Sequence, residues 1–229
     1  MKTIGLIGGM SWESTVTYYQ LINREIAQRL GGFHSAKILL HSVDFAEIET
    51  CQAIGDWHRS GEILTQAAIG LENTGADFLL LCTNTMHKVY SHIQNALSIP
   101  VLHIAQATAT ALQNDKIHQV ALLGTRYTMT QNFYKKEMEE MGIKVLIPQE
   151  ADIDIVHTVI YDELCHGHIR DRSRNEYLRI IQNLRESGAE AVILGCTEIG
   201  LLISDAISPL PVYDTTIIHA RAAVEQSLA

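Results

Sequence analysis

Cys196 is the residue of this chain most suited to chemistry, because a polar turn follows it at the end of an apolar run. The run 190–195 leads into Cys196-Thr197-Glu198, and a short helix is predicted at 199–204. A helix N-terminus stabilises a thiolate through its dipole and free N–H groups, which lowers the cysteine pKa from about 8.5. We therefore expect a reactive thiol at Cys196. The alternative is a buried cysteine that packs as a small apolar residue.

The segment that carries Cys196 occurs a second time, 113 residues earlier in the chain. Residues 187–198 read SGAEAVILGCTE, and residues 74–85 read TGADFLLLCTNT, with no gap in the alignment. Thr83 therefore falls opposite Cys196. A duplicated fold presents the ends of two equivalent strands to one shared cleft, so the pair could place a hydroxyl and a thiol on opposite sides of a substrate.

Cys82 is a second candidate thiol, but the repeat aligns it with Gly195 rather than Cys196. Adjacent residues of a strand point to opposite faces, so Cys82 should face the core if Thr83 faces the cleft. A bulge at the strand end is the alternative that would reverse this orientation. Cys51 and Cys165 are expected to be packing residues.

Polar strand-to-helix turns around these positions suit the binding of a carboxylate. Thr83-Asn84-Thr85 and Thr197 supply hydroxyls, an amide and backbone N–H groups that would otherwise lack partners. The GGMS turn at 8–11 is of the same kind, with Ser11 as the expected N-cap of a helix at 12–29. Its glycine spacing does not fit the GxGxxG fingerprint of dinucleotide-binding folds.

The counterpart of the GGMS turn in the second half is the segment 124–128, GTRYT. Arg126 in this segment either pairs with an anion or is a solvated surface cation. Glu198 would repel an acidic substrate, so we interpret it as a structural or orienting residue. His87, at the start of a predicted helix, is expected to cap or pack rather than to catalyse.

No metal site and no cofactor are predicted. His166 and His168 could bind a metal, but no third ligand accompanies them by spacing, and a solvent-facing loop is the favoured interpretation. The four cysteines show no CxxC spacing.

Composition narrows the class of protein. The 229 residues include 17 Lys and Arg against 26 Asp and Glu, a net charge of −9, which disfavours nucleic acid as a partner. The first apolar run is too short for a signal peptide, and no stretch approaches the roughly 18 apolar residues of a membrane span. We therefore expect a cytoplasmic protein with reduced cysteines, no membrane association and a small-molecule partner.

Short apolar runs alternate with helical patterns, which predicts an α/β fold with parallel sheets covered on both faces. The expected strands are 3–8, 37–43, 77–82, 100–103, 118–124, 143–147, 190–195 and 211–213. The expected helices are 12–29, 60–74, 88–96, 104–114, 128–141, 153–166, 173–187, 199–204 and 215–227.

Two further anchors extend the repeat to the whole chain. IGLIGG at 4–9 resembles VALLGT at 120–125, and SIPVLHIA around Pro100 resembles PLPVYDTT around Pro211. We therefore predict two similar parallel-sheet α/β domains related by internal duplication, with the chain crossing between them at the two prolines. The first domain is 1–99 plus 212–229, and the second is 100–211. The active site is expected in the cleft between them.

The segments GLIGGMSWEST (5–15), LLLCTNTMH (79–87) and ILGCTEIGLLI (193–203) resemble the cofactor-independent aspartate/glutamate racemase family over essentially the whole chain. The resemblance implies two similar α/β domains, no pyridoxal phosphate and a homodimer. It also implies two catalytic cysteines on opposite faces of the substrate Cα. The family motif CNTxH reads here as Thr83-Asn84-Thr85-Met86-His87, so threonine replaces the first cysteine. A subgroup that acts on aspartate and glutamate, with an asymmetric preference for the L-enantiomer, shares this threonine.

The same resemblance implies which residues line the substrate: Met10, Ser11, Asn84, Thr85, Tyr127, Thr128 and Thr197, with Gln52 from the loop after strand 37–43. A threonine hydroxyl does not ionise usefully near neutral pH and needs a water or a neighbour as relay. Our hypothesis is that Cys196 exchanges the proton on one face while Thr83 orders a water on the other.

Two other functions fit the same residues. Relatives that decarboxylate substituted malonates keep only the second cysteine, so a single-thiol decarboxylase or isomerase of this fold is one alternative. The polar TNT turn favours an amino acid over an apolar decarboxylation substrate. A non-catalytic dicarboxylate-binding protein is the other alternative.

Overall fold

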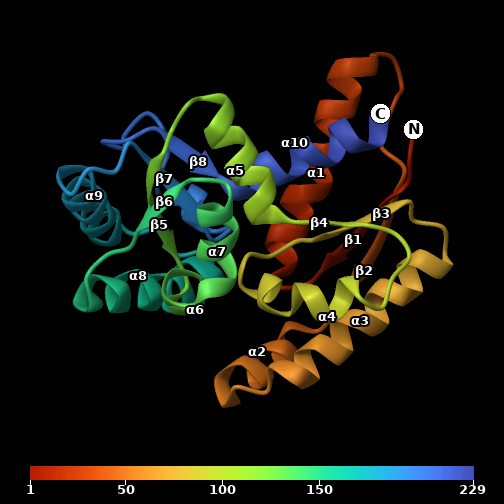
Figure 1. Cartoon of the computed structure of the whole chain (residues 1–229), viewed down its shortest axis with the longest axis horizontal. Coiled ribbons are helices and arrows are strands. Elements are labelled where there is room, and N and C mark those ends of the chain that lie inside the picture. Colours follow the sequence, from red (N-terminus) through yellow and green to blue (C-terminus); the bar gives the residue numbers. More distant parts are fainter. The chain divides into compact units, whose positions relative to one another are not determined.

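The chain folds into two compact α/β units in a computed structural model that describes all 229 residues. The first unit comprises Met1–Ile104 and His219–Ala229, and the second comprises Ala105–Ile218. Each unit has a four-stranded parallel sheet with helices packed against it (Figure 1). The predicted α/β class with parallel sheets is confirmed.

The sheet of the first unit has the strand order β2-β1-β3-β4, and every neighbouring pair is parallel. Its strands are β1 (Ile4–Gly8), β2 (Ile38–Ser42), β3 (Phe78–Leu81) and β4 (Val101–Leu102). The helices of this unit are α1 (Trp12–Leu30), α2 (Phe45–Ile54), α3 (Trp57–Asn73), η1 (Thr85–Val89), α4 (Tyr90–Gln94) and most of α10 (Thr215–Leu228).

Alternate residues of β1 and β3 pack into two separate hydrophobic clusters, one on each face of the first sheet. Ile7, Leu79 and Leu81 pack with apolar residues of α3. Ile4, Leu6, Phe78 and Leu80 pack with residues of α1 and α10. Both faces are therefore buried, which explains why these strands read as continuous apolar runs rather than as alternating ones.

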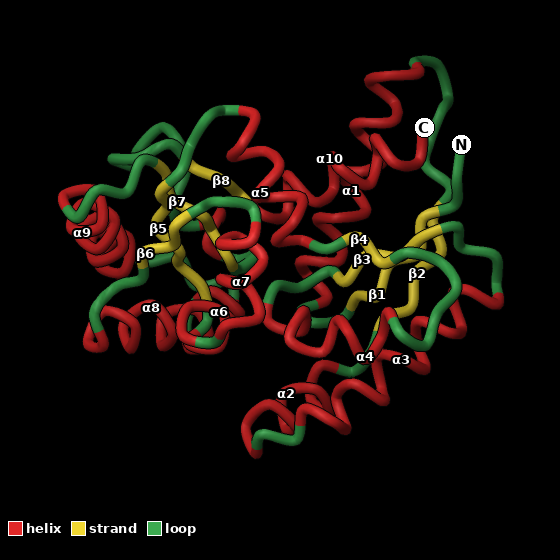
Figure 2. Tube along the Cα trace, in the orientation of Figure 1, coloured by secondary structure: helices red, strands yellow, loops and turns green.

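The second unit repeats this sheet with the order β6-β5-β7-β8, again parallel throughout (Figure 2). Its strands are β5 (Gln119–Gly124), β6 (Lys144–Leu146), β7 (Ala191–Gly195) and β8 (Val212–Asp214). Its helices are α5 (Ile104–Asn114), α6 (Arg126–Thr130), α7 (Asn132–Glu140), α8 (Glu150–Asp162), η2 (Leu164–His166), α9 (Asp171–Glu186) and η3 (Ile199–Leu201).

The two sheets share one topology, in which the first strand of each unit lies between its second and third. In both units the chain runs from the third strand through a 3-10 turn, η1 or η3, toward the fourth strand and then into α5 or α10. The duplication predicted from the sequence therefore fits the arrangement of the elements, and it makes β3 and β7 equivalent.

The two boundaries between the units lie a few residues after the prolines that were expected to mark them. The prediction ended the first domain at 99 and the second at 211. The strands that follow Pro100 and Pro211 still pair within the preceding sheet, β4 with β3 and β8 with β7. The backbone therefore leaves each unit only after its fourth strand, at Ile104 and Ile218.

Several predicted helices are shorter or divided, and one was missed. The predicted helix 128–141 is divided because Gln131 is extended between α6 and α7, with φ −87° and ψ 155°. The predicted helix 199–204 is reduced to the three-residue η3. Helix α2 was missed; Asp44 caps its start and left-handed Gly55 ends it.

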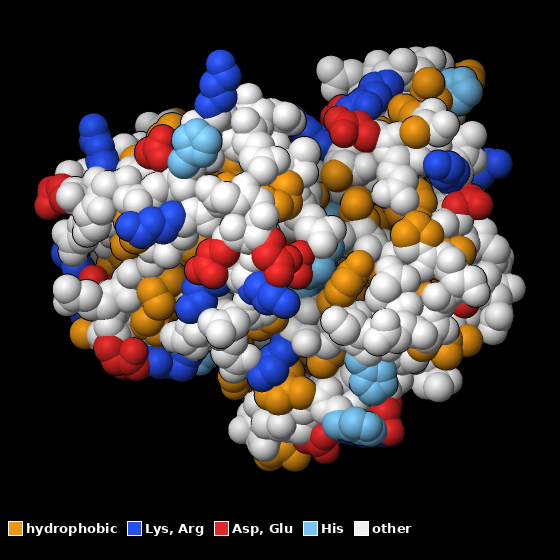
Figure 3. Space-filling model, in the orientation of Figure 1, with side chains coloured by type: hydrophobic (Ala, Val, Ile, Leu, Met, Phe, Trp, Pro, Cys, Tyr) orange, Lys and Arg blue, Asp and Glu red, His pale blue; other side chains and the backbone are white.

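Acidic and basic side chains are interspersed over the face drawn in Figure 3, rather than gathered by sign. The four cysteines are free thiols, as expected. None of the helices is both long enough and apolar enough to cross a membrane.

Candidate active site

The turn after β1 is fixed by a glycine and by side-chain hydrogen bonds. Gly9 has a φ of +93°, and a β-carbon there would lie 2.2 Å from the Val43 carbonyl oxygen, so only glycine fits. The Gly9 N–H donates to Oγ1 of Thr15 over 2.8 Å. Ser11 caps α1 by accepting from the Ser14 N–H, as predicted.

Ser14 connects this turn to the end of β3. Its hydroxyl lies 3.0 Å from the Ser11 carbonyl and 3.2 Å from the Cys82 carbonyl, both acceptors. Met10 and Ser11, two of the predicted substrate residues, are buried in this turn. The hydroxyl of Ser14 therefore places the Ser11 turn beside the residue that precedes Thr83.

Thr83 and Asn84 lie in a buried turn between β3 and η1, and Thr85, also buried, is the first residue of η1. Gln52 lies next to this segment, because its Nε2 donates to Sδ of Met86 over 2.9 Å. Gln52 was expected in a loop, but it belongs to helix α2, which places it on a regular element. The predicted residues of the first unit are thus linked to one region at the carboxyl ends of β1 and β3.

The prediction that Cys82 faces the core is confirmed. Its side chain is fully buried in the cluster that includes residues of α1 and α10. Burial raises the pKa of the Cys82 thiol far above its ordinary value, because the low-polarity surroundings disfavour the thiolate. Thr83, the next residue, is the one that the repeat aligns with Cys196.

Cys196 lies directly after β7 and is half-buried. Its Sγ donates to Oε2 of Glu198 over 3.0 Å, and Oγ1 of Thr197 donates to the same carboxylate oxygen over 2.6 Å. Glu198 is itself buried, so one carboxylate holds both side chains of the turn. The orienting role expected for Glu198 has its physical basis in these two bonds.

The expected lowering of the Cys196 pKa is wrong, because the pKa is raised well above its ordinary value. Burial is the largest cause, followed by the negative charge of Glu198 and the hydrogen bond to it. The helix that was expected to stabilise a thiolate is the single turn η3, too short for a substantial dipole. The resting thiol is therefore protonated.

Tyr127 and Thr128 lie on α6, the short helix after β5. Thr125 caps this helix, and its hydroxyl lies 3.2 Å from that of Thr128. Thr128 is fully buried, and a β-carbon on Gly195 would lie 3.3 Å from its Cγ2, so Thr128 lies beside the residue that precedes Cys196. The ring of Tyr127 instead packs edge-on to His157.

Arg126 is engaged by the protein itself. Its guanidinium pairs with Glu150 over 2.5 Å and with Asp154, both on α8. These two carboxylates raise the pKa of Arg126, led by the hydrogen bond to Glu150. Of the two roles left open for Arg126, pairing with protein carboxylates is the one that the structure shows.

His166 ends η2 and His168 lies in the loop that follows; both are exposed, and their ring centroids lie 6.3 Å apart. No group of three or more His, Cys, Asp or Glu side chains is placed to hold a metal ion.

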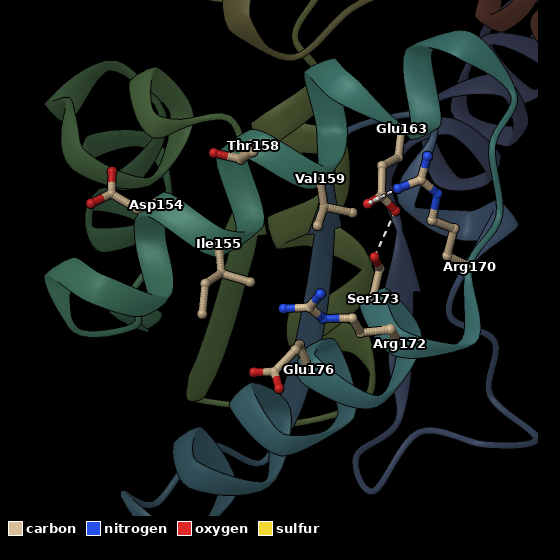
Figure 4. A pocket seen from close by; sticks show the side chains of 9 residues that line it. All are labelled: Asp154, Ile155, Thr158, Val159, Glu163, Arg170, Arg172, Ser173 and Glu176. Carbon is tan, nitrogen blue, oxygen red and sulfur yellow. Dashed lines mark hydrogen bonds and ion pairs between the residues drawn. The ribbon is translucent and has the colours of Figure 1, made fainter.

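A cavity of about 540 Å³ in the second unit lies between α8 and the start of α9, and it contains none of the predicted site residues (Figure 4). In this cavity the Glu163 carboxylate accepts from Ser173 over 2.6 Å and from Arg170 over 3.3 Å. Every carboxylate that lines the cavity is paired with an arginine: Asp154 with Arg126, Glu163 with Arg170, and Glu176 with Arg179. The cavity therefore lacks a carboxylate free for acid–base chemistry.

The family model and the similar proteins found by comparison point to the same family. The sequence model of the family described as Asp/Glu/hydantoin racemase matches residues 7–223. Among curated proteins, the broad specificity amino-acid racemase RacX of Bacillus subtilis is 28% identical over 168 residues, which cover 72% of this chain and 71% of that protein.

Two solved structures resemble the whole chain. A crystal structure from Yersinia pestis, described as a candidate Asp/Glu racemase, is 50% identical, with a TM-score of 0.95 and full coverage of both chains. An aspartate racemase homologue from Pyrococcus horikoshii is 32% identical, with a TM-score of 0.86 and full coverage of both chains.

Proposed function

This chain belongs to the Asp/Glu/hydantoin racemase family, and we propose on that basis that it racemises aspartate, glutamate or both without pyridoxal phosphate. The names of the similar proteins, which are amino-acid, aspartate and glutamate racemases, support an isomerase that acts on amino acids. We propose that this chain belongs to the subgroup with threonine in place of the first cysteine, since residue 83 is Thr.

The hydrogen-bonded pair of Cys196 and Glu198 is the observation that carries the proposed chemistry. Racemisation requires that the proton on Cα be removed from one face and that another be delivered to the opposite face. In the proposed reaction the Cys196 proton passes to Glu198, and the resulting thiolate takes the α-proton. Reprotonation from the same thiol returns the starting enantiomer, and reprotonation from the other face gives the mirror image.

Thr83 is proposed to serve the other face by holding a water molecule. A threonine hydroxyl is too weak an acid and base to exchange the proton itself near neutral pH. A water that donates its proton to the carbanion becomes hydroxide, which must regain a proton from solvent while Glu198 releases to solvent the proton that it took from Cys196. This slow step limits both directions equally in kcat/KM, because racemisation has an equilibrium constant of one.

The polar turns are proposed to bind the carboxylates of the substrate. Backbone N–H groups at strand-to-helix turns, with nearby hydroxyls and amides, are well suited to anions. The proposed binding residues are Met10, Ser11, Gln52, Asn84, Thr85, Tyr127, Thr128 and Thr197. The buried amide side chains of Gln52 and Asn84 support this proposal, since both can donate to a carboxylate.

Exchange of the α-hydrogen in deuterated water tests the proposal directly. Wild-type protein should introduce deuterium at Cα of L-aspartate or L-glutamate, followed by chiral analysis for the D-enantiomer. Cys196→Ser should abolish both signals. Cys165→Ser, which changes the other half-buried cysteine of the second unit, should retain them. Full exchange by Cys196→Ser would contradict the proposed role of the thiol.

The presence of one partly accessible thiol in the two aligned turns also favours a single-thiol enzyme. Cys82 is buried, so only Cys196 remains to protonate an enediolate formed by loss of carbon dioxide. Release of carbon dioxide from a substituted malonate, without deuterium exchange into amino acids, would support that function instead. If L-aspartate raises the melting temperature and neither reaction occurs, the protein is a dicarboxylate binder.

A further inference from the structure

His87 is held by hydrogen bonds at both of its ring nitrogens. Nδ1 lies 2.8 Å from the carbonyl oxygen of Thr83, and Nε2 lies 3.1 Å from the backbone nitrogen of Ile104. A carbonyl oxygen only accepts and a backbone N–H only donates. His87 must therefore carry its proton on Nδ1 and present a bare Nε2, which is one specific neutral tautomer.

The surroundings of His87 also favour the neutral ring. The side chain is almost fully buried, and its ring centroid lies 4.6 Å from that of His103, 6.0 Å from that of His219 and 6.3 Å from that of Tyr90. Burial lowers the pKa of His87 well below its ordinary value, and the neighbouring imidazoles add to this effect. Protonation of Nε2 would also place its N–H against the N–H of Ile104, so two donors would face each other. The observed contacts therefore exclude the imidazolium.

The two groups that His87 joins are separated in sequence, and one of them, Thr83, takes part in the proposed reaction. Thr83 begins the polar turn after β3. Ile104 is the first residue of α5 and the last residue before the chain leaves the first unit. The imidazole is therefore the direct link between the turn and the start of the crossing segment.

The second unit has different residues at the two equivalent positions. The repeat aligns His87 with Gly200 and His103 with Asp214. A β-carbon on Gly200 would lie 2.7 Å from Oδ2 of Asp214, so these two positions are also adjacent. There, Oδ1 of Asp214 accepts from the N–H groups at the start of α10, at 2.8 Å from Thr216. In the first unit the acceptor at the start of the following helix is instead a neutral ring nitrogen, Nε2 of His87.

We propose that His87, as the neutral Nδ1–H tautomer, is a positioning residue that ties the Thr83 turn to the first residue of α5. Its catalytic consequence rests on the proposed function, because Thr83 is the residue that it would position. The ring does not exchange a proton with the substrate, since both nitrogens are occupied by backbone groups. Its role is to fix the Thr83 carbonyl, and with it the orientation of the turn.

Nitrogen-15 NMR of histidine-labelled wild-type protein tests the tautomer without any turnover. The expected result near pH 7 is a protonated Nδ1 and an unprotonated Nε2 for His87, with the resonances assigned by comparison with His87→Gln. A proton on Nε2, or on both nitrogens, would overturn the proposal, because the Ile104 N–H would then have no acceptor in this ring.

Two substitutions separate the two bonds. An asparagine amide reaches the position of Nδ1 and a glutamine amide reaches that of Nε2, so His87→Asn keeps the bond to Thr83 and His87→Gln keeps the bond to Ile104. Amide hydrogen exchange at Ile104 should accelerate at least about tenfold in His87→Asn and stay near wild type in His87→Gln. Equal protection of Ile104 in the two variants would contradict the proposed tie.

Kinetics then test the positioning role. In α-hydrogen exchange, His87→Gln should lower kcat about tenfold with a smaller change in KM, while His87→Asn should stay within about threefold of wild type. His34→Gln and His34→Asn, at an exposed loop position, are the controls and should match wild type. Equal kcat in the two His87 variants would refute the positioning role. An inactive wild type would refute the proposed function alone, because the NMR and amide-exchange results still decide whether the tie exists.

Discussion

The Cys196 thiol donates a hydrogen bond to Glu198 across 3.0 Å, so the thiol proposed to react is paired with a buried carboxylate. Burial, together with the negative carboxylate, raises the thiol pKa and favours the protonated sulfur. In the proposed reaction the same oxygen accepts that proton once a substrate is bound. A carboxylate two residues from the thiol can thus restrain the free protein from reacting and still assist the bound one.

Glu198→Gln should therefore make Cys196 more reactive toward an alkylating agent in the absence of substrate. The amide keeps the shape of the side chain but removes the charge that disfavours the thiolate. We expect iodoacetamide to modify Cys196 up to about tenfold faster at pH 7.5, the factor that corresponds to about 1.4 kcal/mol. Mass spectrometry of the Cys196 peptide measures the rate, and Glu139→Gln on the exposed part of α7 is the control. Slower labelling in Glu198→Gln would show that the carboxylate does not restrain the thiol.

The alkylation rate of wild-type Cys196 should keep increasing with pH and should not level off below about pH 9. The thiolate is the reactive form, and a raised pKa moves its formation to higher pH. Cys82 provides an internal comparison, since its fully buried thiol should stay unlabelled while the protein is folded. A plateau of Cys196 labelling near pH 7 would mean that the thiol is activated rather than restrained.

Much of the fold was predictable because its strands and helices follow from local patterns of apolar residues in the sequence. Both sheets are buried on both faces, so their strands are continuous apolar runs such as β3 and β7 that stand out between helices. Helix α2 was missed because its apolar residues show little periodicity, although Asp44 and Gly55 mark its two ends. The units divide a few residues after the two prolines, because the strand that follows each proline still pairs within the preceding sheet, which the spacing of prolines does not reveal.

The orientation of neighbouring strand residues was predictable from the sequence, but the electrostatics around Cys196 were not. Alignment of the repeat was sufficient to separate Thr83 from Cys82, since adjacent strand residues point to opposite faces. The direction of the Cys196 pKa shift could not be predicted, because it depends in part on whether the Glu198 side chain folds back onto the sulfur. Likewise, the His87 bond to Ile104 joins residues from separate elements and leaves no local signal.

His219 should make the protein less stable in acid. Its ring is fully buried between the Tyr18 hydroxyl and the Leu102 carbonyl, each 2.9 Å away, and burial lowers its pKa to about 3. Below about pH 6.5, His219 is protonated in the unfolded chain. In the folded chain it stays neutral down to about pH 3. The free energy of unfolding should therefore fall by about 1.4 kcal/mol per pH unit within this window because of this residue.

His219→Gln isolates this contribution, since an amide at the Nε2 position can still donate to Leu102 but does not titrate. Between pH 6.5 and pH 5, denaturant unfolding should show a loss that is about 2 kcal/mol smaller in the variant than in wild type. His34→Gln, at an exposed position, should follow the wild-type curve. Parallel curves for His219→Gln and wild type would mean that His219 is not kept neutral by the fold.

Thr83→Cys should increase racemisation in both directions by the same factor. The substitution places an ionisable thiol at the position that aligns with Cys196, in a buried turn whose backbone is held by His87. A positioned acid–base group contributes about 10²–10⁴-fold, so a gain of at least about tenfold in kcat/KM is expected even without optimal geometry. Circular dichroism can follow each enantiomer separately, and Thr83→Ser, which keeps a hydroxyl, should stay near wild type. If Thr83→Cys changes neither rate while Cys196→Ser abolishes both, residue 83 does not serve the second face, and another group must deliver that proton.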